Sequence, residues 1–82
     1  MYAQKVLPVS LPVMISKEGK WFVAACPLLD IATQGRTEKE AKENMQDLIK
    51  EFFADPDTKK PSLEEISSAS LSLVNISVKL RV

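Results

Sequence analysis

The residues that could bind a metal ion or move a proton are few in this chain and widely spaced. The chain has no histidine and one cysteine, so the usual general base, the commonest metal ligand and every Ser-His or Cys-His pair are missing. Its four aspartates are expected in a turn, a helix and a loop, and their spacing does not indicate convergence on one ion. These aspartates are Asp30, Asp47, Asp55 and Asp57. We therefore expect no enzyme, no metal site and no cofactor.

The composition favours neither phosphate binding nor nucleic acid binding. The only glycines are Gly19 and Gly35, too few for a glycine-rich phosphate loop. Eleven basic residues balance eleven acidic ones, which gives a formal net charge of zero. The chain as a whole therefore lacks the positive field that nucleic-acid-binding domains usually carry, and we expect no direct binding to DNA or RNA.

The length of 82 residues predicts one domain over residues 1–82. A domain of this size buries only about 60 to 65% of its unfolded surface, so self-association would help to stabilise it. The lone Cys26 lies in an apolar run, which favours a small buried side chain in a reducing cytoplasm. No apolar run approaches the roughly 20 residues needed to cross a bilayer, and we expect a cytoplasmic protein without a membrane partner.

Period-two alternation of apolar residues predicts strands near both ends of the chain. The apolar stretch 6–15 alternates over its second half, and we interpret it as a first, half-buried strand. Pro8 and Pro12 have the same parity, so their missing N–H groups fall on one edge, which should be unpaired or bulged there. Residues 74–82 alternate most cleanly and predict a final strand, with a change of parity at Leu73.

A central strand is predicted between these two. Residues 17–20 supply a glycine-containing hairpin turn, and the run 21–26 that follows is apolar on both faces. A single helix covers only one of those faces, so the other is expected to contact another subunit. We assign this interface to Trp21, Phe22 and Val23 and expect a homo-oligomer, either a dimer or a tetramer.

A short third strand at 30–34 and a turn at Gly35 lead into a helix that the sequence specifies strongly. Thr37 and Glu40 match the T-x-x-E capping box, which fixes the start of the helix, and residues 55–57 stop it. An apolar stripe at positions i, i+4, i+7 and i+11 is expected to pack on the sheet. The stripe consists of Ala41, Met45, Leu48 and Phe52.

The element order predicts an α+β fold. Strands and helix follow as β-β-β-α-β, which makes a two-layer sandwich with an antiparallel-rich sheet and one helix on one face. Residues 58–70 are polar and serine-rich and are interpreted as a surface connection, with at most one helical turn near 61–65. The second face of the sheet is left without a cover.

The helix carries a row of like charges, the acidic row, formed by Glu43, Asp47 and Glu51 at i, i+4 and i+8. Each such pair costs about 0.2–0.5 kcal/mol, so local stability does not favour the pattern. Two interpretations remain open. Lys39 and Lys50 neutralise the row as part of an ordinary solvated face, or the row is a docking surface for a basic partner.

Two further apolar residues, Ile49 and Phe53, lie beside the helix stripe and widen it. They are candidates for a partner-binding surface. The alternative is that they pack under the loop 56–67, because small apolar clusters under long loops are common.

The run from Trp21 to Phe53 resembles the core of the HicB-type antitoxin family. Members typically show an aromatic strand, a proline turn, a strand ending in Gln-Gly and a threonine-capped helix rich in glutamate and alanine. The matching residues are Trp21, Pro27, Gln34, Gly35, Thr37, Glu40 and Ala41. The resemblance covers about two fifths of the chain, and its motif is one that forms a fold and not a catalytic site.

The resemblance implies a partial RNase H-like fold without a nuclease site. It also implies a partner, a small basic HicA-type toxin that cleaves mRNA and that the chain would occlude. Two features differ from many relatives: Leu29 and Asp30 replace a glycine-containing turn, and the sequence ends at Val82 without a DNA-binding domain, so we expect no autoregulation by DNA binding. The alternative is an orphan homo-oligomeric domain with a structural or small-ligand role and no cognate toxin.

Overall fold

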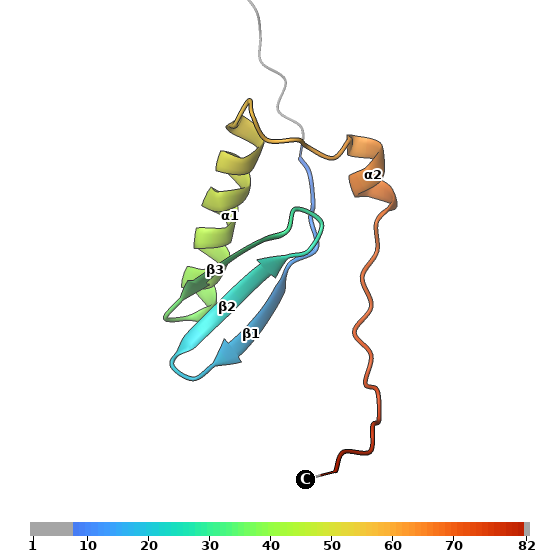
Figure 1. Ribbon diagram of the computed structural model, residues 1–82. Coiled ribbons are helices and arrows are strands. Elements are labelled where there is room, and N and C mark those ends of the chain that lie inside the picture. The colour runs from blue at the N-terminus through green and yellow to red at the C-terminus, as the bar shows by residue number, and fades with distance from the viewer. Residues whose placement is uncertain (1–7, 82) are drawn as a thin grey trace, which may run out of the picture.

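A three-stranded antiparallel sheet and one long helix form two layers in this computed structural model, which describes residues 8–81 (Figure 1). The predicted α+β class and the β-β-β-α order are confirmed. Residues 6–7 of the first predicted strand and Val82 of the last lie outside the described residues. The elements are β1 (Met14–Glu18), β2 (Trp21–Cys26), β3 (Ile31–Gly35), α1 (Glu38–Ala54) and α2 (Leu63–Ser68).

The hairpin between β1 and β2 closes through a two-residue turn. Glu18 pairs with Trp21 across it, and Gly19 has a φ of 63°. Glycine supplies that backbone conformation at the first central position of a type II′ turn. The predicted turn over 17–20 is therefore too long, because Lys17 and Glu18 belong to β1.

Two prolines explain why β1 begins later than the alternation predicted. Alternate residues of an antiparallel strand direct their backbone N–H and C=O groups to the same neighbouring strand. The two-residue turn directs the backbone groups of Glu18 toward β2. Met14 has the same parity as Glu18, and so do Pro12 and Pro8, which have no N–H to donate. The ladder between β1 and β2 accordingly starts at Met14, and its upstream continuation is unpaired, as expected from the two prolines.

The core lies between α1 and one face of the sheet. From β2, Ala24 and Cys26 are completely buried on that face, and they meet the turn before β3 and the first half of α1. The core is formed by Ala24, Cys26, Leu29, Ala41 and Met45. Cys26 is thus a buried free thiol, as its apolar surroundings predicted.

Three hydrogen bonds fix the start of α1 against β3. The Glu40 N–H donates to Thr37 Oγ1 over 3.0 Å, as the capping pattern predicted. The Glu40 carboxylate accepts instead from the Arg36 N–H at 3.3 Å, one residue before the expected partner, so the reciprocal half of the box is shifted. Asn44 Nδ2 donates to the Gln34 carbonyl at 2.8 Å and ties the second turn of α1 to the strand.

Gly35 brings the backbones of β3 and α1 together. A Cβ at this position would lie 2.5 Å from the Ala41 nitrogen and 2.9 Å from the Glu40 carbonyl carbon. Both neighbours are helix backbone, which cannot swing aside as a flexible side chain does. The role of Gly35 is therefore steric, and the lack of a side chain lets the helix approach the strand.

We predict that Gly35→Ala destabilises the fold by about 1–3 kcal/mol, because the added methyl forces the helix away from the sheet. Urea unfolding followed by circular dichroism measures the change. Gln34→Ala is the matched control in the same strand and should stay within about 0.5 kcal/mol, because Gln34 contributes its backbone carbonyl to the Asn44 contact. Equal stability of the two variants would contradict the close approach.

Asp55 organises the end of α1. Its N–H donates to the Glu51 carbonyl at 3.0 Å, while its carboxylate accepts from the Asp57 N–H at 2.9 Å and the Thr58 hydroxyl at 2.8 Å. The Asp57 N–H, then the Thr58 hydroxyl and the charge of Lys60 hold the pKa of Asp55 below its ordinary value of 3.8. The ionised carboxylate is thus the form that the folded loop prefers.

The free energy of unfolding should therefore depend on Asp55 in acid. A carboxyl group whose pKa is lowered by folding stabilises the folded state above pH 3.8. This contribution to the free energy of unfolding is lost as the pH falls through the folded-state pKa. We predict that Asp55→Asn lowers stability at neutral pH and that its difference from wild type shrinks below pH 3.8. Urea titrations across this range measure it. Asp57→Asn is the control, because that carboxylate accepts no hydrogen bond from the rest of residues 8–81.

A short second helix, α2, follows the loop after α1. Ser62 and Glu65 form a complete capping box, in which the Glu65 N–H donates to Ser62 Oγ at 3.1 Å and the Ser62 N–H donates back at 3.2 Å. Ile66 of this helix is 6% exposed. The single helical turn predicted near 61–65 is therefore a six-residue helix that begins at Leu63 and ends at Ser68.

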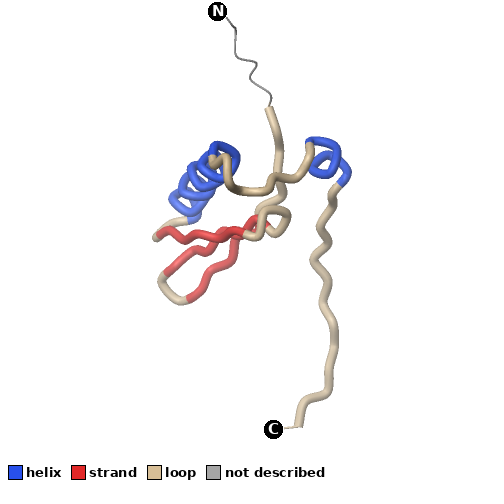
Figure 2. Tube along the Cα trace, turned by 45° about the horizontal axis from the view of Figure 1, so that its top comes forward, coloured by secondary structure: helices blue, strands red, loops and turns tan. Residues whose placement is uncertain are grey.

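The final strand predicted over 74–82 does not form within the described residues. The C-terminal tail, residues 70–81, has no strand pairing and every residue in it is exposed. Figures 1 and 2 show it running away from both layers. Alternation predicts the direction of the side chains of a strand but supplies no neighbour, and no strand within residues 8–81 pairs with the backbone of the tail. The four-stranded sheet is thus corrected to three strands.

Candidate interaction site

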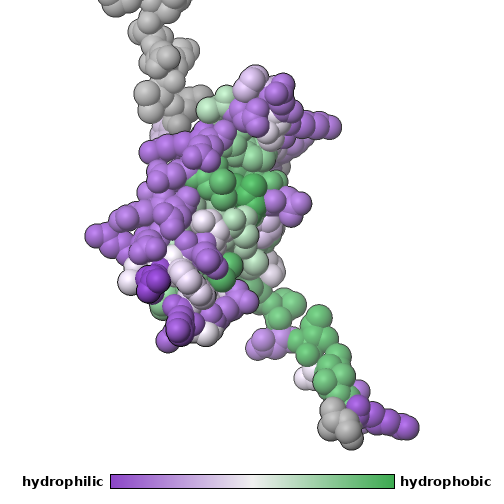
Figure 3. All heavy atoms as spheres, turned by 60° about the vertical axis from the view of Figure 1, so that its left-hand side comes forward, coloured by the Kyte–Doolittle hydropathy of each residue, from purple (hydrophilic) through white to green (hydrophobic). Residues whose placement is uncertain are grey.

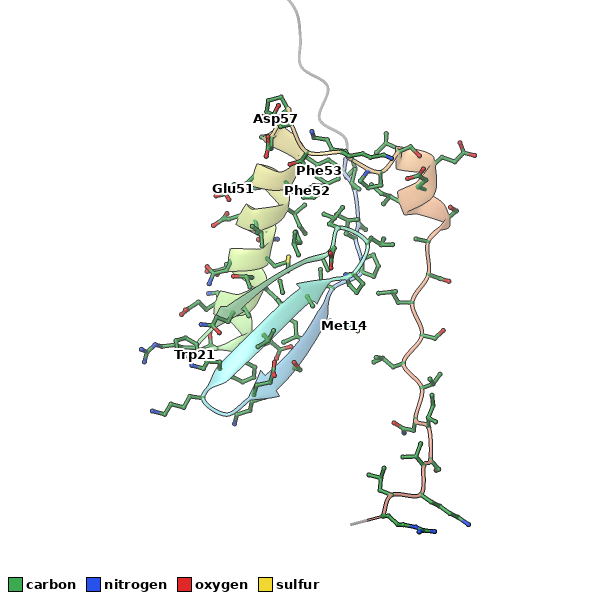
Figure 4. The ribbon with its side chains drawn as sticks, in the orientation of Figure 1. Met14, Trp21, Glu51, Phe52, Phe53 and Asp57 are labelled. Atoms are coloured by element: carbon green, nitrogen blue, oxygen red, sulfur yellow. The ribbon has the colours of Figure 1, made fainter. Side chains whose placement is uncertain are left out.

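The acidic row lies on the solvent side of α1. Glu43, Asp47 and Glu51 are all exposed, and Figure 4 shows Glu51 pointing away from the sheet. Within residues 8–81 the one ion pair of the row joins Lys39 Nζ to Glu43 Oε1 at 4.0 Å, with the two side chains 87% and 59% exposed. A pair this open contributes little. Lys50 makes no ion pair with the row, so of the two lysines only Lys39 lies within ion-pair distance of one of its carboxylates.

Ile49 and Phe53 face a different surface, the apolar groove between α1 and the chain that leads into β1. Both are half-buried, and the groove has a volume of about 940 Å³. Its apolar walls are Val9, Leu11, Val13, Ile15, Met45, Ile49, Phe53, Ala54 and Leu63. From the loop 56–67 only Leu63 reaches this lining, and it is itself 54% exposed, so the loop does not cover the two residues.

The open face of the sheet contains two of the three predicted interface residues. Trp21 is 37% exposed and Val23 is half-buried there. Phe22 alternates to the other face, where it packs beside the core, so the assignment of Phe22 to the open face is corrected. Arg36 Cζ lies 5.3 Å from the centre of the Trp21 ring and covers part of it.

The open face is chemically mixed. With Trp21 and Val23 it carries the exposed Met14, which Figure 4 shows on β1. Polar side chains of β1 and β3 share it, because cross-strand partners lie on the same face. These polar residues are Ser16, Glu18 and Gln34, and Arg36, which follows β3, joins them over the Trp21 ring. A strongly apolar subunit interface is therefore not built on this face alone.

The four aspartates lie apart from one another, in the elements expected for them. Asp30 is in the turn before β3, Asp47 is on α1, and Asp55 and Asp57 are in the loop after it. Among residues 8–81, no three His, Cys, Asp or Glu side chains come together as metal ligands would. None of the helices described here has the length and apolar character of a membrane span.

Asp30 lies in the turn that joins Pro27 to β3. Its φ is 55°, the left-handed conformation that glycine adopts freely and that aspartate tolerates better than most residues. The turn is closed by the Asp30 N–H donating to the Pro27 carbonyl at 3.2 Å. Asp30 therefore forms a left-handed turn at a position without glycine.

The single tryptophan reports on the open face. We predict that acrylamide quenches Trp21 fluorescence in the folded protein and that Arg36→Ala increases the quenching constant, because it uncovers the ring. Lys17→Ala is the control and should leave the constant unchanged, since Lys17 Nζ lies 5.9 Å from the Phe22 ring on the opposite face. Strong protection of wild-type Trp21 would instead show that a second subunit covers this face.

Comparisons with known proteins do not supply a relative. No family model matches this chain, and no curated protein or solved structure matches it significantly. A proposal for the function therefore has to be based on the exposed side chains of the helix and the sheet and on the residue pattern of 21–53.

Proposed function

We propose that this chain is a HicB-like antitoxin module that binds a small, basic HicA-type toxin in the cytoplasm and occludes it from mRNA. The observation that carries the proposal is the acidic row, whose three carboxylates are exposed on one face of α1 with a single weak ion pair among the described residues. The resemblance of residues 21–53 to HicB-type sequences supports the same partner.

The spacing of the row makes it act as one patch. Residues four apart on a helix are separated by about 6 Å along its axis, which is less than the Debye length of about 8 Å at physiological salt. Carboxylates at this spacing therefore present a summed negative field to an approaching cation. Such a field speeds encounter with a basic partner and selects against an acidic one.

The helix holds the acidic row rigidly in place. Thr37 caps α1, Gly35 lets its first turn approach β3, and Ala41 and Met45 are buried on the side of the helix that faces the sheet. A preorganised surface loses little conformational entropy on binding. Occlusion requires only that the partner's RNA-binding surface be covered, so a rigid charged face is sufficient and no reaction by this chain is involved.

We predict that changing Glu43, Asp47 and Glu51 together to lysine weakens binding to the cognate toxin by a factor of at least about 10, because rim charges reverse sign. Each replacement adds two positive charges. Isothermal titration calorimetry at two salt concentrations measures the affinity, and wild-type binding should weaken as salt rises.

A charge-matched variant distinguishes the effect of the acidic row on binding from the effect of the net charge of the protein. Glu18, Asp57 and Glu64 are also exposed but lie in β1, the loop and α2, and their joint change to lysine alters the total charge equally. This control should bind nearly as wild type does. Equal loss in both triple variants, or unchanged binding by the row variant, would remove the acidic row from the proposal.

A second candidate function is an orphan homo-oligomeric domain with a structural or small-ligand role. It is favoured by the exposed apolar residues, among them Trp21 on the open face and Leu73 in the C-terminal tail, which is 87% exposed. A chain with this role would self-associate in the absence of any basic partner. Binding of a toxin with measurable inhibition of its RNA cleavage would decide for the first candidate.

A further inference from the structure

The C-terminal tail has the side-chain pattern of a strand and touches no sheet. Val74, Ile76, Val78 and Leu80 are between 68% and 78% exposed and alternate with polar residues. Figure 3 shows these apolar side chains carried away from the body of the molecule. Exposing these apolar side chains to water is unfavourable, so burial of the tail against another surface would stabilise it.

The sheet has a free edge that suits an added strand. β1 is an edge strand, because the sheet order is β1-β2-β3. Since Glu18 faces β2, the residues of opposite parity, Val13, Ile15 and Lys17, direct their N–H and C=O groups outward. Pro12 has the other parity, so its missing N–H lies toward β2 and does not interrupt this outer edge.

The apolar groove borders the same edge on the helix side. Val13 and Ile15 line it with their side chains while their backbone groups face outward, and Ile49 and Phe53 form the wall on α1. A strand added to β1 would place one face of its side chains beside this groove. The apolar set of the tail matches that face, and its polar set, which includes Ser77 and Lys79, would remain in solvent.

The tail does not reach this edge in its own molecule. It starts after α2, whose Ile66 lies next to Pro8 and Pro12 in a shallow depression. Figures 1 and 2 agree that it then runs clear of β1 and of the groove. Within the described part of each molecule, the strand-like tail has no sheet and the outer edge of β1 has no strand, and a second copy offers both complements at once.

We propose that two copies of this chain exchange their C-terminal tails, each tail adding as a strand to the outer edge of β1 in the other copy and packing into its apolar groove. Such an exchange is isologous, because the same two surfaces meet twice around a two-fold axis. It uses neither the acidic row nor the open face, so it is independent of the proposed toxin binding.

Light scattering of the full chain tests the exchange, and a dimer is expected. The double variant Ile76→Glu with Val78→Glu should shift the protein to monomer, because it puts charges on the docking face. The double variant Asn75→Glu with Ser77→Glu adds the same charge to the solvent face and should leave the dimer intact. Circular dichroism of each variant checks that α1 and the sheet remain folded.

A cross-linking experiment distinguishes exchange from closure of the tail onto its own molecule. Copies carrying Ser16→Cys, on the face of the sheet to which Ser77 would point, and differently tagged copies carrying Ser77→Cys are mixed and treated with a flexible bis-maleimide; the native Cys26 is buried. Exchange predicts a covalent product containing both tags. The chain carrying both substitutions should likewise give mainly cross-linked dimer at low concentration.

Three results would overturn the exchange. These are a monomer at every concentration, a dimer that the Ile76 and Val78 variant does not dissociate, and a doubly substituted chain that cross-links only within itself. The second result would assign the dimer to another surface, and the third would place the tail on its own β1. None of the three bears on toxin binding by the acidic row.

Discussion

The close approach of α1 to β3 at Gly35 is the contact on which the other features of the domain depend. With no side chain between them, the backbones meet, and Asn44 and the Thr37 cap hold the helix in that position. Ala41 and Met45 then fall over β2 and complete the core. One side of α1 is thereby fixed against the sheet, and the remaining sides are left for other molecules.

The interior is small for the surface that it must organise. Six hydrophobic residues are buried among residues 8–81, and one of them, Ile66, lies in α2. A core of this size stabilises a domain only modestly. Burial of further apolar surface by association would add to it, and the groove and the tail both offer such surface.

Local signals predicted the parts of the fold that neighbouring residues decide. The helix start at Thr37, the central strand and the element order follow from capping chemistry and periodicity, which act over a few residues. The turn at Gly19 was predicted too long because its neighbours Lys17 and Glu18 have no strong turn or strand preference. Neighbouring residues of a strand point to opposite faces, and for this reason Phe22 does not share the open face with Trp21 and Val23.

The sequence did not show which segments far apart along the chain meet in the fold. The alternation of residues 74–82 identified a strand-like segment but contained nothing about its partner, which the three-stranded sheet does not provide. One wall of the apolar groove could be predicted, because Ile49 and Phe53 extend the apolar stripe of the helix. Its opposite wall, formed by residues 9–15, is more than thirty positions away along the chain, and only folding brings the two together.

The two proposed interactions use separate sides of one helix. The acidic row faces solvent, whereas Ile49 and Phe53 face the groove. A partner on the charged side and a second copy on the apolar side could therefore be bound together without competing for the same residues. Energetic coupling between them would have to pass through α1 and the few core side chains beneath it.

Cys26 gives this small domain an internal reporter. Its thiol is fully enclosed between β2 and α1, next to the residues that hold the two layers together. A thiol reagent in solution reaches it only when the layers separate, so the rate of its modification measures how often the interior opens. A ligand that clamps the helix onto the sheet would slow that reaction, even if it bound far from the sulfur.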